Sequence, residues 1–180
     1  SVDIQSLKGT SDLYGSINSF QADIRYSSES LMSESFALKL NKNEINGSGL
    51  VTFLGGNLAN LNPAEFFIQL DKNTIQLNDF PSLKPYLNAQ SILKADVVVK
   101  GSLQDFEVNF KLQGAYRSKI EGTIQVVDGL QKDKIRINSD AISVKTSDKA
   151  LGAIFLKETY DQLKPYTTKT GDLIIDSEFT

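Results

Sequence analysis

Apolar and polar residues alternate with a period of two along much of this chain, and this pattern constrains the fold more than any other feature of the sequence. From Phe20 to Tyr26 the even positions are apolar and the odd positions are polar. Because successive side chains of a β-strand point to opposite faces, such a stretch predicts a strand with one apolar and one polar face. The alternation recurs at residues 36–40, 106–112 and 120–126, and shorter pairs occur at Ile75 and Leu77, Ile135 and Ile137, and Ile142 and Val144.

Short turn sequences separate these stretches. Gly, Asn and Asp tolerate positive φ at little cost, and they cluster between the expected strands. Strands joined by close turns pair in antiparallel fashion, and a strand with one wet face is typical of an antiparallel sheet. The sequence therefore predicts an all-β fold with an antiparallel sheet. The expected turns are Asn46-Gly47, Gly55-Gly56-Asn57, Asp128-Gly129 and Gly171-Asp172.

Two or three short helical insertions interrupt the strand pattern. Asn62-Pro63-Ala64-Glu65 places Asn at an N-cap, Pro at N1 and Glu at N3. A short turn is expected around Pro81 to Leu87, and the longest helix runs from about Asp148 to Gln162 and is ended by Pro165. We interpret this helix as a cover over the open end of a sheet. A helix lying on a membrane surface is the alternative, although its lysines are balanced by acidic residues.

The chain also contains an internal repeat. Residues 45–51 are echoed 75 residues later by residues 120–126, and Leu83-Lys84-Pro85-Tyr86 returns 80 residues later as Leu163-Lys164-Pro165-Tyr166. We therefore expect residues 1–180 to be one repetitive β segment of a longer protein, with approximate repeats at 36–101 and 106–180. Further expected correspondences are Leu93 with Leu173, Asp96 with Asp176, and Ile75-Gln76-Leu77 with Ile142-Ser143-Val144.

The residue types that most often carry catalysis or hold transition metals are missing. The chain has no His and no Cys, which excludes Ser-His-Asp and Cys-His catalysis, disulfides and zinc ribbons. Its Asp and Glu residues lie mostly at turns or on the polar side of strands, where carboxylates are usually solvated. We therefore expect no enzymatic activity, no cofactor and no metal. A net charge of -3, spread along the chain, also disfavours nucleic acid as a partner.

Several short motifs follow one another in a recognisable order. A Leu-x-Pro-x turn and a strand precede Gly101-Ser102-Leu103-Gln104-Asp105-Phe106, which leads into an amphipathic strand and then Ile120-Glu121-Gly122-Thr123. This order resembles the repeats of the AsmA-like superfamily. Within that superfamily it is most similar to the TamB translocation and assembly module family of Gram-negative bacteria.

The resemblance implies a fold, a location and a function. The fold would be a repetitive sheet curled into a U-shaped trough with an apolar interior, called a β-taco. The parent protein would be anchored in the inner membrane, and this segment would lie in the periplasm and provide a hydrophobic groove for phospholipid transfer between the inner and outer membranes. The alternative function is a structural or interaction module that assists outer-membrane protein assembly, with an outer-membrane β-barrel assembly protein as its partner.

A lipid-conducting groove needs apolar side chains and no catalytic group. Burying a lipid acyl chain gains about 0.8 kcal/mol per CH₂, so phospholipid acyl chains are the expected partners. A closed β-sandwich core has the same sequence signature, and both interpretations stay open at this point. The candidate lipid-binding residues are Phe20, Ile24, Phe36, Leu38, Phe106, Val108, Phe110, Ile124 and Val126.

Overall fold

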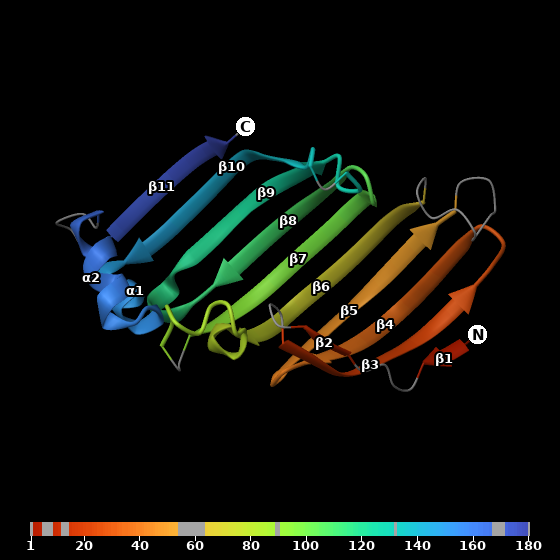
Figure 1. The fold of residues 1–180 in the computed structure, drawn as a ribbon, viewed down its shortest axis with the longest axis horizontal. Helices are drawn as coiled ribbons and strands as arrows, with labels where there is room; N and C mark the ends of the chain where they lie inside the picture. Colours follow the sequence, from red (N-terminus) through yellow and green to blue (C-terminus); the bar gives the residue numbers. More distant parts are fainter. Residues whose placement is uncertain are drawn as a thin grey trace.

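The computed structural model of the chain contains one antiparallel sheet (Figure 1). It describes residues 2–4, 9–11, 15–53, 64–88, 91–131, 133–166 and 172–179. The prediction of an all-β antiparallel fold is confirmed. The strands are β1 (Val2–Ile4), β2 (Gly9–Ser11), β3 (Gly15–Tyr26), β4 (Ser30–Leu40), β5 (Asn43–Thr52), β6 (Glu65–Gln76), β7 (Ile92–Ser102), β8 (Phe106–Gln113), β9 (Lys119–Val127), β10 (Arg136–Ser147) and β11 (Asp172–Phe179).

Strand order in the sheet follows strand order in the chain from β3 to β11, because each strand pairs with the next one along the sequence. β1 and β2 both pair with β3, so β1 and β11 lie at opposite ends of the sheet (Figure 1). The sheet is therefore open rather than closed into a barrel. Among the described residues, neither face is covered by a second layer along its length (Figure 1).

Two short α-helices, α1 (Asp148–Ile154) and α2 (Lys157–Leu163), lie at one end of the strands (Figure 1). The expected single helix over 148–162 is thus broken at Phe155 and Leu156. Phe155 forms an isolated antiparallel bridge with Leu87, and the Leu156 N–H donates to the Tyr86 carbonyl at 3.0 Å. These contacts with the segment before β7 pull the chain out of helical geometry. Three 3₁₀ turns complete the helical content: η1 (Leu77–Asp79), η2 (Ala115–Arg117) and η3 (Lys164–Tyr166).

Two of the sequence expectations for turns and helices are wrong. Asn46 and Gly47 lie inside β5, and the β4–β5 hairpin turns instead at Asn41, whose φ is 54°. Glu65 begins β6 rather than occupying the first turn of a helix, while Asn62, Pro63 and the expected turns at Gly55–Asn57 and Gly171 lie outside the described residues. The turn at Asp128-Gly129 is confirmed, with Asp128 at φ 61°.

The pairing of β5 with β6 changes character along its length. Backbone pairs join the strands from Thr52 and Glu65 to Gly47 and Leu70. Beyond that point two buried asparagine side chains bridge the strands, and we call this region the amide seam. Asn73 accepts from the Asn46 N–H at 2.6 Å and donates to the Asn46 carbonyl at 2.8 Å, while Asn43 makes the same two bonds with Gln76 at 2.6 and 3.3 Å.

The described residues bury few large apolar side chains. Ser91 is the largest described side chain that is fully buried. The accessible surface is 11771 Å², whereas a compact monomer of 19.8 kDa exposes about 8,600 Å². This excess is what a single-layer sheet produces, because at least one face of each strand stays open. The buried apolar residues are Ala22, Phe53, Ala64, Leu87, Leu93, Ala95, Ala150 and Leu151.

Candidate functional site

Cross-strand register divides the strand residues between two faces of the sheet. Residues that lie directly opposite each other on paired antiparallel strands point to the same face. We call one face the front face and define it by three rows that cross β4, β5, β6, β7, β8 and β9 in that order. The outer row is Leu31, Val51, Phe66, Gly101, Phe106 and Val126; the middle row is Ser33, Gly49, Ile68, Val99, Val108 and Ile124; the inner row is Phe36, Gly47, Leu70, Val97, Phe110 and Gly122.

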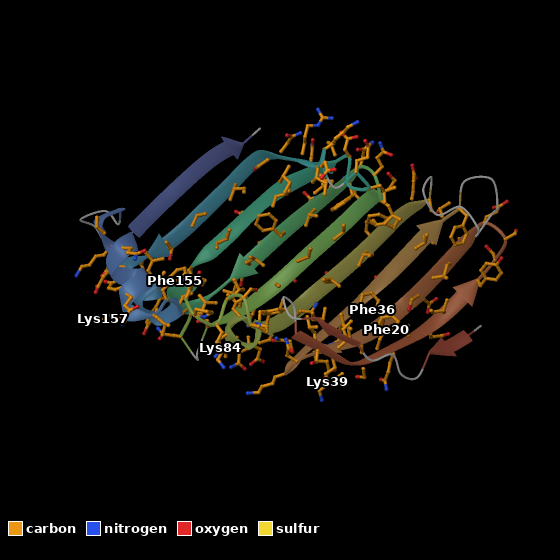
Figure 2. All side chains as sticks on the ribbon, viewed as in Figure 1. Phe20, Phe36, Lys39, Lys84, Phe155 and Lys157 are labelled. Atoms are coloured by element: carbon orange, nitrogen blue, oxygen red, sulfur yellow. The ribbon has the colours of Figure 1, made fainter. Side chains whose placement is uncertain are left out.

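All nine candidate lipid-binding residues fall on this front face. Six of them are members of the three rows, Ile24 pairs with Ser33 of the middle row, and Phe20 pairs with Leu38. The Phe20 and Phe36 rings lie 5.9 Å apart, side by side on β3 and β4 (Figure 2). Each of the nine side chains is half-buried. The register therefore brings these residues together on one continuous surface that is only partly covered.

The opposite face, which we call the back face, carries most of the charges. One cross-strand row on it runs Lys100, Glu107 and Gln125 on β7, β8 and β9. Lys100 lies 2.9 Å from Glu107, and Asn109 donates to the same carboxylate. These hydrogen bonds, first from Lys100 and then from Asn109, hold the pKa of Glu107 below its ordinary value. This part of the back face is a solvated polar surface.

A pocket of about 460 Å³ opens on the front face over β4, β5 and β6. Every side chain in its lining is apolar, so the pocket offers no side-chain hydrogen-bond partner to an occupant. A peptide or a charged headgroup would lose its hydrogen bonds to water there without replacement, which costs several kcal/mol. A neutral hydrocarbon loses nothing of this kind. The lining residues are Leu31, Val51, Phe53, Ala64, Phe66, Ile68 and Leu103.

None of the nine predicted residues lines this pocket, so the sequence interpretation missed it. Phe66 and Ile68 alternate with Phe67 and Gln69, but the preceding Asn-Pro-Ala-Glu pattern was interpreted as a helix start. Leu103 lies in the β7–β8 hairpin and reaches the pocket from two strands away. The alternation at Phe66 was the one signal that could have indicated part of this lining.

The pocket lies beside a cross-strand pair of small residues, Ser33 and Gly49. A Cβ atom built on Gly49 would lie 3.8 Å from the Phe67 carbonyl oxygen and 4.0 Å from the Ile68 Cγ1, with nothing closer. Both are ordinary van der Waals distances, so position 49 has room for a methyl group without any shift of its neighbours. Gly47, two residues earlier, is covered: its Cβ would lie 2.8 Å from the Phe36 Cζ. Glycine is needed at position 47 because the Gln69 carbonyl oxygen, the Leu70 side chain and the Phe36 ring all come too close to leave room for a Cβ.

The far end of the front face is covered by the helices. The Asn88 side chain donates to the Phe155 carbonyl at 2.6 Å, and the Ser91 hydroxyl donates to the Ile154 carbonyl at 2.6 Å. The Ile154 and Leu93 side chains both lie close to Gly114, within 3.6 and 2.9 Å of where its Cβ would be. Figure 2 places Phe155 within this helical end of the sheet. The interpretation of the 148–162 region as a cover over a sheet end agrees with these contacts.

The described residues hold no cluster of three or more acidic side chains that could bind a metal ion. Among the same residues, no helix is long and apolar enough to cross a bilayer. Comparison of the chain with protein families, with curated proteins and with solved structures finds no match.

Proposed function

We propose that the front face binds the acyl chains of phospholipids and that the chain is a non-catalytic segment of a lipid-transfer groove. The observation that carries this proposal is the half-buried state of the front-face residues in a sheet with no second layer over it in the described residues. Soluble monomers rarely expose contiguous apolar patches larger than a few hundred Å². A face of this kind is typical of a surface that another apolar molecule covers.

The composition of the three rows favours hydrocarbon as that molecule. They contain no charged residue, and their one hydroxyl, on Ser33, already donates to the Ser35 carbonyl at 2.8 Å. A protein partner would need hydrogen-bond acceptors and donors for its own backbone. An acyl chain needs none, and each CH₂ that leaves water contributes about 0.8 kcal/mol.

The proposed groove has the curled, U-shaped form of a β-taco, with the front face inside. Bulges support curvature because an extra residue bends its strand and increases the local twist. The register shifts at five of the strand pairs, among them β4–β5 between Ser33 and Phe36 and β6–β7 between Leu70 and Asn73. The periplasmic location and transfer between the inner and outer membranes belong to the same proposal and come from the family resemblance.

A second candidate function is an interaction module for outer-membrane protein assembly. The open edge of the sheet favours it: in the described residues β11 pairs only with β10. An unpaired strand edge can accept a strand from another chain through backbone hydrogen bonds. Such a partner would depend on the edge strand and not on the front face.

Two neighbouring positions of β5 test the first function. Val51 lines the pocket, while Leu50 points to the back face and is 37% exposed. We expect Val51→Glu to lower lipid capture from phosphatidylcholine vesicles at least tenfold, because an acyl chain cannot replace the water around a carboxylate. Leu50→Glu is the matched control and should leave capture unchanged. Lipid extracted from the purified protein and quantified by mass spectrometry gives the result, with circular dichroism reporting the fold.

Equal capture by wild type and both variants would rule out the front face as the lipid site. The second function makes the opposite prediction for partner binding. If the chain acts through its edge strand, Val51→Glu should spare the binding of a β-barrel assembly protein. Loss of lipid capture with partner binding retained would then separate the two roles.

A further inference from the structure

We infer that the cross-strand pair Ser33–Gly49 determines where along the front face a hydrocarbon chain is held. This inference rests on the proposed lipid-binding function and adds to it a position and a residue pair. We call β4–β7 the first unit and β8–β11 the second unit. In the first unit the small pair leaves room beside the pocket, and in the second unit the equivalent pair fills that room.

The register establishes which positions of the two units are equivalent. Val51 and Val126 both lie in the outer row, and Gly47 and Gly122 both lie in the inner row, four strands apart in each case. Between them, Gly49 and Ile124 share the middle row. Their β4 and β8 partners are Ser33 and Val108. The pair Ser33–Gly49 in the first unit is therefore the counterpart of Val108–Ile124 in the second.

The two pairs differ in how much side chain they place on the front face. Gly49 contributes none, and a Cβ atom at its position would make only ordinary van der Waals contacts. Ser33 contributes a short side chain that turns to the Ser35 carbonyl. Val108 and Ile124 are branched apolar residues, so the same part of the second unit is filled by its own side chains. Ile68, the neighbour of Gly49 in the middle row, is itself part of the pocket lining.

The chemistry of the pocket specifies the part of the lipid that it takes. All seven lining side chains are apolar, so the complement of the pocket is an uncharged chain without hydrogen-bonding groups. The pocket accepts the hydrocarbon and leaves the headgroup outside. In the second unit a chain rests on a filled surface, where it gains less contact than in a pocket. The first unit thus holds a chain, and the second supports its passage.

Exchanging the two pairs tests this assignment. A phosphatidylcholine with a diazirine in one acyl chain is supplied in vesicles, and the crosslinked residues of the full 180-residue chain are mapped by mass spectrometry. In the wild type we expect at least tenfold more crosslinks at Val51, Phe66 and Leu103 than at Val126 and Ile137. Ser33→Val with Gly49→Ile should lower the first set at least tenfold, since each displaced CH₂ contributes about fourfold.

The reciprocal exchange, Val108→Ser with Ile124→Gly, should raise crosslinking at Val126 and Ile137 to the level of the first unit. Gly49→Ala serves as a milder variant if the double exchange fails to fold, and it should give a smaller decrease at the same residues. Equal crosslinking of both units in the wild type, or a pattern that neither exchange moves, would overturn the inference while leaving lipid binding intact. Absence of crosslinks in every variant would instead overturn the proposed function.

Discussion

The first and second units are built on the same rows of the sheet and differ on both faces. On the front face, the first unit has Ser33 and Gly49 where the second has Val108 and Ile124. On the back face, the first unit has Met32 and Leu50 where the second has Glu107 and Gln125. The period of two lets each face change without disturbing the other. At these positions the first unit therefore has more apolar side chains on its back face and smaller side chains on its front face.

Two units of one sheet can thus share their backbone rows and still present different surfaces. The rows determine where the side chains project, and a few of those side chains determine whether the surface is apolar or charged, hollow or filled. The back-face row of the first unit includes Leu50 and Phe67, which are 37% and 40% exposed. The same row continues through Lys100 on β7, the last strand of the first unit, to Glu107 on β8, so the Lys100–Glu107 ion pair joins the two units. The predictions below test these contrasts.

The largest effect on stability is expected from emptying the filled pair. Ile124→Gly removes a half-buried side chain and places a flexible residue in the middle of β9, so it should lower the free energy of unfolding by about 3 kcal/mol. The change Gly49→Ala should be neutral or stabilise by up to about 1 kcal/mol, because a Cβ at position 49 meets only ordinary van der Waals contacts. Urea denaturation of both variants measures the difference. Equal destabilisation by the two changes would contradict the view that a side chain is missing at position 49 and is packed at position 124.

A smaller effect is expected at the amide seam. Asn73→Ala leaves the N–H and carbonyl of Asn46 without their partners, which should cost about 2 kcal/mol. The Asn46 amide should then exchange with solvent much faster, as measured by hydrogen–deuterium exchange. Val144, which pairs with Ile120, serves as the control in the second unit. Val144→Ala should change stability through lost packing but leave the exchange of the β9 amides near the wild-type rate.

The smallest effect concerns the back-face ion pair. The pKa of Glu107 is lowered in the folded chain, so its contribution to stability is present above the ordinary pKa near 4.5 and is lost as pH falls through the lowered value. Glu107→Gln should remove about 0.2–1 kcal/mol at neutral pH, because the pair is partly exposed. In thermal melts between pH 2 and pH 7, the melting temperature of the variant should fall less at acidic pH than that of the wild type. Met32→Gln at the equivalent place should leave the fall in melting temperature at acidic pH unchanged.

The sequence alone could predict the strands and one shared face, because the period of two holds on either side of each bulge. At the β4 bulge it shifts, and Ser33 and Phe36 share the front face although they are three residues apart. Phe20 and Val126 lie on strands far apart, yet both were placed on the same surface. The pocket could not be predicted, since it depends on Leu103 approaching Val51 from a hairpin two strands away. Gly47 was expected in a turn, but it lies inside β5, where the Gln69 carbonyl and the Phe36 ring approach too closely for a side chain.

Two further differences have causes that lie far away in the chain. Phe155 was expected within one helix, but it bridges Leu87, so the helix breaks for a partner that the local sequence does not indicate. The sequence matches Ile75 with Ile142, whereas the register places Ile142 opposite Gly122, in line with Leu70. Register depends on which strands become neighbours. A motif that recurs in the sequence indicates the order of the strands, but it does not determine the register in which they pair.

The amide seam has a mechanical consequence. Side-chain amides reach further than backbone groups and turn about their own χ angles, so β5 and β6 can change their separation there while all four of the bridging hydrogen bonds persist. We therefore expect the spacing of β5 and β6 to vary more at the amide seam than where their backbones pair directly. If the front face binds acyl chains as proposed, such variation would let it adjust its width to thin or bulky chains without breaking a backbone pair.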